Sequence, residues 1–139
     1  MGFRLENELE KAAIPFLEEN RFLYSWQVPL HNRVIDLAAI NPEGQLIGVE
    51  FKLRDWNRAL NQALRNSNAF DYIFVCVPGG SYLEKLTKKA DELGVGVMVY
   101  DNEIGTIRIE HPAQKIERQW KPNVEYIRNF LRSRGTNWI

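Results

Sequence analysis

The sequence predicts an α/β fold in which a central mixed β-sheet is flanked by helices. Segments with apolar residues at helical spacing alternate with short apolar segments typical of strands. Residues 71–77 and 95–100 are almost continuously apolar, as expected of strands buried on both faces of a sheet. Residues 33–40 and 46–53 flank Asn41-Pro42-Glu43-Gly44, which favours a tight turn and an antiparallel pair. The sheet is therefore expected to be mixed, with both antiparallel and parallel strands.

The elements can be assigned in order along the chain. The N-terminal part is expected to hold one helix and three strands, at residues 4–19, 21–28, 33–40 and 46–53. The next helix has Asp55 as its N-cap, because a short acidic side chain accepts hydrogen bonds from the first free amides. The other elements, in order helix, strand, helix, strand, strand and basic C-terminal helix, are expected at 55–68, 71–77, 81–94, 95–100, 106–109 and about 121–134.

The length and composition indicate one intracellular domain, spanning residues 1–139. A chain of 139 residues falls within the usual domain size of roughly 100–150 residues. Its apolar segments are far shorter than the ~20 residues of a membrane-spanning helix, and no signal peptide is visible. Cys76 is the one cysteine, which excludes an internal disulfide framework. We therefore expect a cytoplasmic protein with no membrane partner.

The charges balance overall but not along the chain. There are 18 basic and 18 acidic residues, and neutrality argues against nucleic-acid binding because such proteins usually have a basic surface. Residues 111–139, however, hold six basic and two acidic side chains. The simplest interpretation is a solvated C-terminal helix. A basic end on an acidic body still weakens the argument against nucleic acid.

Charged residues interrupt two of the predicted strands. Asp36 lies in an otherwise apolar segment, and Glu50 and Lys52 lie two residues apart in the next one. Because strand side chains alternate, Glu50 and Lys52 should share a face. If residues 41–45 form the loop, Asp36 lies directly opposite Glu50, with Cβ atoms about 4.5–5.5 Å apart.

Two carboxylates in this arrangement need a positive charge between them. Like charges directly opposite each other are unfavourable, and burial makes them more so. Lys52 could supply part of the charge, and a hard divalent ion such as Mg²⁺ could supply the rest. A register shifted by one residue would place the acids on opposite faces. The alternative is an ordinary ladder of ion pairs on a half-exposed sheet face.

Asp36 followed by Glu50-Phe51-Lys52 resembles the Asp…(Asp/Glu)-x-Lys core of the PD-(D/E)XK nuclease superfamily, which includes restriction endonucleases and archaeal Holliday-junction resolvases. The order of elements over residues 4–100 is also similar. Ile35 stands where the family name has proline. The resemblance implies a restriction-endonuclease-like core and metal-dependent hydrolysis of phosphodiester bonds.

The resemblance also implies roles for individual residues. Asp36, Glu50 and the backbone carbonyl of Phe51 would hold Mg²⁺ or Mn²⁺. Lys52 would orient or deprotonate the attacking water and stabilise charge on the phosphate. Gln62 would face the active site from the following helix, so that the catalytic set is Asp36, Glu50, Lys52 and Gln62.

Members of the superfamily often add a metal-binding glutamate from the first helix. Glu6, Glu8 and Glu10 compete for this role. The spacing to the turn at Asn20 favours Glu8, whereas Glu6 lies closer to the core-facing side of the helix. We select Glu8 as the expected metal ligand.

Five arginines are candidate contacts to nucleic acid, with DNA favoured over RNA. Arg58 and Arg65 form a stripe with Gln62 at helical spacing. Arg33 precedes Asp36, but strand alternation places it on the opposite face unless the strand begins with a bulge. The full set is Arg33, Arg58, Arg65, Arg128 and Arg132. Because so small a domain offers little recognition surface, we also expect a homodimer or a larger assembly.

Three functions are consistent with these patterns. The first is an active Mg²⁺- or Mn²⁺-dependent endonuclease or exonuclease in DNA repair, recombination or defence. The second is a non-catalytic nuclease-fold module that binds nucleic acid or a protein partner. The third is a small α/β protein in which the acids and the lysine meet by chance. The joint presence of Asp36, Glu50, Lys52 and Gln62 favours the active nuclease.

Overall fold

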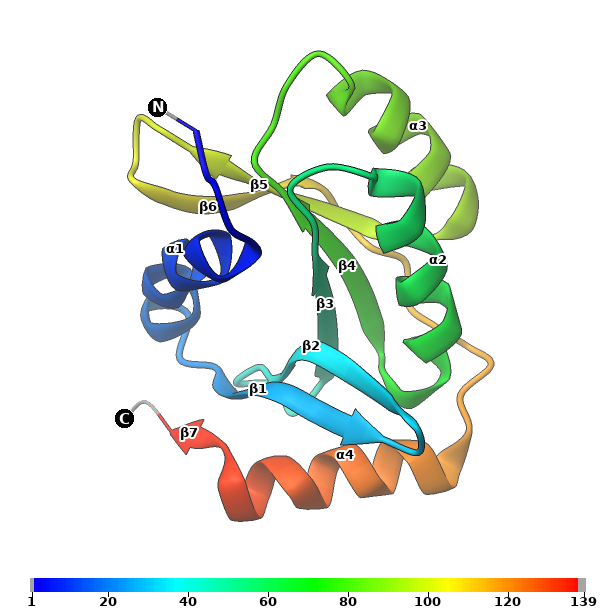
Figure 1. Ribbon diagram of the computed structural model, residues 1–139. Helices are drawn as coiled ribbons and strands as arrows, with labels where there is room; N and C mark the ends of the chain where they lie inside the picture. The colour runs from blue at the N-terminus through cyan, green and yellow to red at the C-terminus, as the bar shows by residue number, and fades with distance from the viewer. Residues whose placement is uncertain (1, 138–139) are drawn as a thin grey trace.

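Residues 2–137 are described by the computed structural model, and within them the chain forms one seven-stranded mixed sheet (Figure 1). The strand order is β6-β5-β4-β3-β2-β1-β7. The strands are β1 Leu23–Leu30, β2 Arg33–Ile40, β3 Leu46–Phe51, β4 Tyr72–Val77, β5 Gly96–Asp101, β6 Thr106–His111 and β7 Thr136–Asn137. The helices are α1 Glu6–Glu19, α2 Trp56–Asn66, α3 Leu83–Leu93 and α4 Lys121–Arg134, with a 3₁₀ turn, η1, at Ser67–Ala69.

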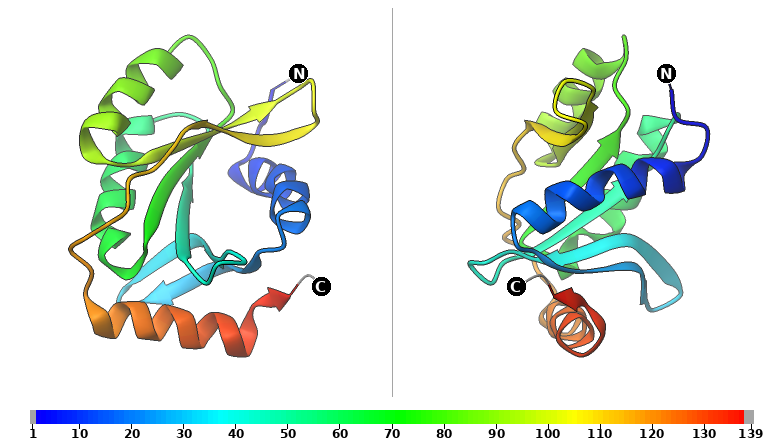
Figure 2. Two further views of the ribbon diagram at one scale, coloured as in Figure 1. Left: turned by 180° about the vertical axis from the view of Figure 1, so that it is seen from behind. Right: turned by 90° about the vertical axis from the view of Figure 1, so that its left-hand side faces the viewer.

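The sheet separates two apolar cores, one for each face. Helix α1 covers one face alone, while α2 and α3 cover the other (Figures 1 and 2). Buried side chains of α4 join the core of α2 and α3, where α4 packs against β1 and β2. The parallel strands β3, β4 and β5 lie between the helical layers and are nearly completely buried, as their continuous apolar sequences require. The predicted α/β class with a mixed sheet is confirmed.

Most predicted elements are present with small changes at their ends. Strand β1 begins at Leu23 instead of residue 21, because Arg21 has a positive φ of 57° and still belongs to the turn after α1. The Asp55 side chain accepts a hydrogen bond from the Arg58 amide, as expected of an N-cap. The basic C-terminal helix expected at about 121–134 is α4. Among the described residues, no helix combines the length and apolar character needed to cross a bilayer.

The β2–β3 hairpin has the register predicted from its loop. Ile40 pairs with Leu46, and the pairing continues to Leu37 opposite Val49. The turn is closed by a hydrogen bond of 2.9 Å from the Gly44 amide to the Asn41 carbonyl. Gly44 has a φ of 84°, a left-handed conformation that glycine adopts without strain. The hairpin is therefore tight at its turn.

Strand β2 changes face at Asp36. Leu37 packs in the core beneath α1, but Ile35 packs in the core on the other side of the sheet. Regular alternation would place both on one face. The β1–β2 ladder skips Asp36 and its partner position, Gln27, whose φ is 53°. This irregularity turns the first residues of β2 relative to the rest of the strand.

Candidate active site

The two strands of the hairpin separate at the end that carries the acids. Beyond the Leu37–Val49 pair, the same register would place Asp36 opposite Glu50, but the ladder ends there. Instead, the Phe51 amide donates a hydrogen bond of 2.8 Å to Oδ2 of Asp36. A side-chain carboxylate thus serves as the acceptor for the last residue of β3 at the point where β2 departs.

Glu50 is the most deeply buried charged side chain of the described residues, with 1% of its surface exposed. Oε2 accepts a hydrogen bond of 3.2 Å from the Asn66 side-chain amide. Burial, and then the neighbouring charge of Asp36, raise the pKa of Glu50 to about 8. Burial also raises the pKa of Asp36, against the opposing effect of the Phe51 N–H. Asp36 and Glu50 are therefore both harder to ionise than carboxyl groups in water.

Helix α1 contributes two further acids to this end of the hairpin. Glu6 Oε2 lies 3.5 Å from Nζ of Lys52, whose side chain is 21% exposed. Burial, followed by the charges of Asp36 and Glu6, raises the pKa of Glu10 to about 7. Glu6 and Glu10 are four residues apart and share a helix face. The site therefore gathers side chains from β2, β3, α1 and α2.

Glu8 does not fit the role that the sequence suggested. Its Oε1 accepts hydrogen bonds of 2.8 Å from the amides of Arg4 and Leu5, so that it caps the start of α1. These bonds, with that from Leu5 the stronger, lower the pKa of the exposed Glu8. Of the three competing glutamates, Glu6 and Glu10 face the cluster. The signal lay in the helical wheel, on which Glu6 falls beside the apolar stripe of α1.

Asn66 is a site residue that sequence reasoning missed. It is the last residue of α2 and only 3% exposed. Gln62, the residue expected to face the site, lies one turn earlier on the same helix and is partly buried. The i, i+4 relation of Gln62 and Asn66 was the available signal, but a polar residue near a helix end usually indicates a solvent-facing position.

Arg33 does not extend into solvent. Its Nε donates to Oδ1 of Asn66 at 2.9 Å and its Nη2 to the Arg65 carbonyl at 3.2 Å. The change of face at Asp36 brings Arg33 to the α2 side of the sheet, which corrects the expectation from simple alternation. The β1–β2 register is the same on both sides of Asp36, so the change comes with the left-handed backbone of Gln27 and not with the bulge that the sequence analysis allowed. Two of the donor atoms of Arg33, Nε and Nη2, are thus engaged within the protein.

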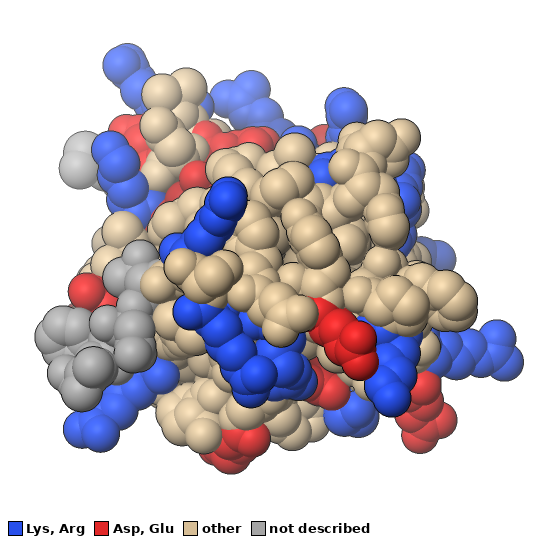
Figure 3. All heavy atoms as spheres, turned by 90° about the horizontal axis from the view of Figure 1, so that it is seen from below, with Lys and Arg blue, Asp and Glu red and all other residues tan. Residues whose placement is uncertain are grey.

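The other four arginines lie on α2 and α4. Arg128 donates from Nη1 to the Gly44 carbonyl at 2.9 Å, at the turn end of the hairpin. Arg58 and Arg65 are exposed on α2, and Arg132 is exposed on α4. Figure 3 shows the face that carries α4, where basic side chains are interspersed with acidic and neutral ones. No single basic surface covers the part of that face that the structure describes.

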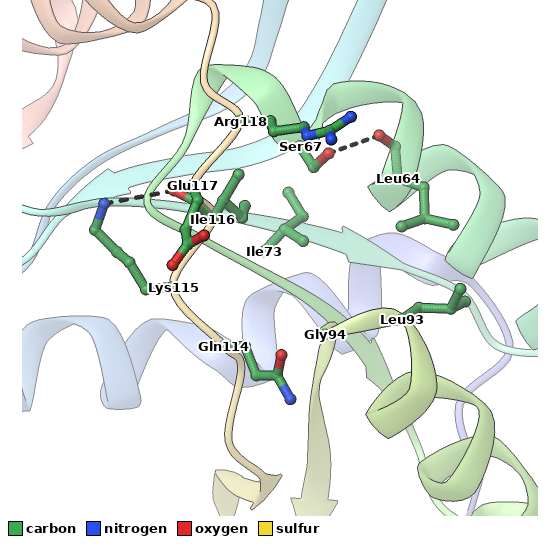
Figure 4. Close-up of a pocket in the computed structure, with 10 residues that line it drawn as sticks. All are labelled: Leu64, Ser67, Ile73, Leu93, Gly94, Gln114, Lys115, Ile116, Glu117 and Arg118. Carbon is green, nitrogen blue, oxygen red and sulfur yellow. Dashed lines mark hydrogen bonds between the residues drawn. The ribbon is translucent and has the colours of Figure 1, made fainter.

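The described residues hold no preformed three-acid metal centre, and the pocket drawn in Figure 4 lies away from Asp36 and Glu50. No three His, Cys, Asp or Glu side chains within residues 2–137 are arranged so that they could hold a metal ion. A pocket of about 420 Å³ lies elsewhere, between the ends of α2 and α3 and residues 114–118 (Figure 4). Its lining includes neither Asp36 nor Glu50.

Comparisons with known proteins support the fold and leave the activity open. No family model matches the chain, and no curated protein matches it. A structure of a protein of unknown function from Silicibacter pomeroyi matches with a TM-score of 0.71 and 15% identity, covering 94% of this chain and 86% of that one. A repair endonuclease from Pyrococcus abyssi matches with a TM-score of 0.45 and 12% identity over 70% of this chain and 47% of that one. The first match shows a similar fold, and we draw nothing from the second.

Proposed function

We propose that the protein is a nuclease that hydrolyses phosphodiester bonds with Mg²⁺ or Mn²⁺ and has a restriction-endonuclease-like core. The observation that carries this proposal is the meeting of Asp36 and Glu50 where the hairpin opens, with Lys52 directly after the last residue of β3. The resemblance of Asp36…Glu50-Phe51-Lys52 to the PD-(D/E)XK core supports the same function. DNA is the favoured substrate.

The donor set fits a hard divalent cation. Carboxylate and carbonyl oxygens are the ligands that Mg²⁺ prefers, and Mg²⁺ commonly binds through one or two carboxylates while it keeps several waters. Asp36, Glu50 and the Phe51 carbonyl can therefore suffice without a third acid. A cation between the two carboxylates also offsets the burial and mutual repulsion that raise their pKa values. Glu6 or Glu10 replaces Glu8 as the acid supplied by α1.

The remaining residues have distinct tasks. Asp36, Glu50 and the Phe51 carbonyl would hold the Mg²⁺ or Mn²⁺ ion, which would supply Lewis-acid activation of the phosphate and of the attacking water. The Lys52 ammonium orients the attacking water and stabilises the negative charge that develops on the phosphate oxygens. Glu6 holds that ammonium beside the acids. Gln62 helps to position water or phosphate from α2.

The exposed arginines provide contacts to the phosphate backbone. Arg58 and Arg65 extend from α2, the helix that also carries Gln62 and Asn66. Phosphate contacts fix the position of a nucleic acid without reading its sequence. Arg132 on α4 can act in the same way only on a longer substrate or through a second copy of the chain. A homodimer remains a prediction, which light scattering at micromolar concentration will test.

A non-catalytic module that binds nucleic acid or a protein partner is the second candidate. One observation favours it: the ammonium of Lys52 is already engaged by Glu6 at 3.5 Å. A lysine held in this way can serve as a structural ion pair. The two candidates share the fold and differ in whether Lys52 acts on a bound phosphate.

The decisive assay measures cleavage of single-stranded, duplex and branched DNA and of RNA, with Mg²⁺, Mn²⁺ or EDTA. Lys52→Ala is compared with Lys88→Ala, which removes an exposed lysine from α3. The nuclease proposal requires metal-dependent cleavage that Lys52→Ala reduces by about 100-fold or more, while Lys88→Ala cleaves like the wild type. Binding without cleavage by every form of the protein would favour the second candidate. Neither binding nor cleavage would contradict both.

A further inference from the structure

Asn66 is an unusual residue for the place it occupies. Asparagine is a weak helix former, and a buried amide costs free energy unless its hydrogen-bonding groups find partners. Asn66 nevertheless ends α2 with 97% of its surface covered and points its amide at a buried carboxylate. The chain thus brings a polar side chain to a buried position, where both ends of its amide find partners.

The contacts of Asn66 fix which way its amide points. The Arg33 Nε–H can only donate, so the atom it meets at 2.9 Å must be the side-chain oxygen of Asn66. The amide nitrogen is then directed to Oε2 of Glu50 at 3.2 Å. Because an amide accepts at one end and donates at the other, Arg33 determines the donor that Glu50 receives.

Arg33 is itself anchored at two points. Its Nη2 donates to the carbonyl of Arg65, one of the carbonyls in the last turn of α2 that have no partner within the helix. The guanidinium therefore joins the start of β2 to the end of α2. This junction lies next to the irregularity at which β2 turns away from β3.

We infer that Arg33 and Asn66 form a positioning relay that holds the Glu50 carboxylate in the orientation needed to bind a divalent cation. This inference rests on the proposed function. Asn66 donates to Oε2 of Glu50 at 3.2 Å, so the direction of its amide sets the orientation of the carboxylate. Groups that orient metal ligands in this way commonly change metal affinity by about 10- to 100-fold when they are replaced. Arg33 acts through Asn66 and touches neither the cation nor Glu50.

The test measures Mn²⁺ affinity of the full chain by isothermal titration calorimetry. Asn66→Leu keeps a side chain of similar size but removes the donor, and Arg33→Met removes the guanidinium. Two matched controls break similar contacts elsewhere. Asn68→Leu removes the hydrogen bond to Asn123, and Arg108→Met removes the ion pairs of β6. Melting temperatures are recorded for every variant.

The relay predicts that Asn66→Leu and Arg33→Met each weaken Mn²⁺ binding by about 10- to 100-fold, while both controls bind like the wild type. The double variant should bind no more weakly than Asn66→Leu alone, because Arg33 has no route to Glu50 without the amide. If Asn66→Leu does not fold, Arg33→Met decides the question, since Arg33 is only partly buried.

Two results would overturn the inference and are distinguishable. Lower melting temperatures with unchanged Mn²⁺ affinity in both variants would show a purely structural role and leave the proposed function standing. A wild-type protein that does not bind Mn²⁺ at millimolar concentration would contradict the proposed function and the relay together.

Discussion

The two ends of β3 carry the same hydrogen bond in opposite surroundings. At the start of the strand, the Leu46 amide donates to Oδ2 of Asp71 at 2.7 Å. At its end, the Phe51 amide donates to Oδ2 of Asp36 at 2.8 Å. Each aspartate replaces a backbone acceptor at the point where a neighbouring strand is missing. On the evidence of these two hydrogen bonds alone, Asp71 and Asp36 would be given the same structural role.

Their further contacts separate them. Asp71 also meets Nζ of Lys115 and Nε2 of Gln119, each at 3.0 Å. Burial alone would raise the pKa of Asp71, but the bonds from Leu46, Lys115 and Gln119 together lower it below its ordinary value. Burial raises the pKa of Asp36, and the neighbouring Glu6 adds to the effect.

The difference teaches how to separate a structural carboxylate from a functional one. Asp71 has all the donors it needs within the protein and therefore stabilises the fold. Asp36 has one backbone donor and lies beside Glu50, Glu6 and Lys52, and burial still raises its pKa, as is common at functional sites. The predictions below test this contrast, starting with the largest expected effect.

Asp36→Asn should abolish activity without harming the fold. The amide oxygen can still accept the Phe51 hydrogen bond, but the carboxylate proposed to hold the metal is lost. We expect cleavage to fall by at least about 100-fold and the melting temperature to stay equal or rise, because a buried charge is removed. Cleavage assays and thermal melts measure the two effects. Full activity of the folded Asp36→Asn variant would contradict the distinction drawn between Asp36 and Asp71.

Asp71→Ala should have the reverse effect. It leaves the buried Leu46 amide without its acceptor and releases Lys115 and Gln119. Loss of a hydrogen bond to a charged group together with an unpaired buried donor costs about 1–3 kcal/mol of unfolding free energy. Urea denaturation measures this loss. The specific activity of the folded fraction should match the wild type, and a large drop would mean that both ends of β3 serve the site.

The pH dependence of stability should identify Asp71 as the ionised partner. Its pKa is lower in the folded than in the unfolded state, so its contribution is present above the unfolded value of about 3.9. That contribution is lost as the pH falls through the folded pKa. The stability difference between wild type and Asp71→Asn should therefore be constant from pH 7 to about pH 5 and shrink below about pH 4. A difference that grows on acidification would contradict the lowered pKa.

The smallest effects are expected from the exposed arginines. Replacing Arg58 and Arg65 by glutamine should weaken DNA binding and reduce its dependence on salt by about one unit of slope per arginine. Arg128→Gln should leave DNA binding unchanged, because that side chain is bound to the Gly44 carbonyl at the other end of the hairpin. Fluorescence anisotropy over a salt series distinguishes the effect of the two α2 arginines from that of Arg128. Equal effects from all three would point to a binding surface that includes α4.

The sequence was sufficient to predict the β2–β3 hairpin, its register and the acids that it carries. A turn with Pro42 and Gly44 sets the loop length, and alternation then determines the register from Ile40–Leu46 to Leu37–Val49. The predicted order of helices and strands follows from apolar spacing, because helical and strand periods differ strongly. These features depend on residues close together in the chain.

Features that depend on long-range packing could not be predicted in this way. The left-handed backbone of Gln27 turns the start of β2 and carries Arg33 to the α2 side, and glutamine gives no signal for that conformation. The rotation of α1, set by burial of Leu9 and Ala13, decides that Glu6 faces the site and Glu8 does not. Asn66 becomes a site residue only because the end of α2 meets Arg33 and Glu50.

The most direct test of the account is a crystal structure with Mn²⁺, analysed by anomalous scattering. The account predicts one strong peak between the carboxylates of Asp36 and Glu50, at about 2.0–2.3 Å from their oxygens, and no such peak in an Asp36→Asn crystal. A fully occupied Mn²⁺ elsewhere, with no peak between the carboxylates of Asp36 and Glu50, would contradict it.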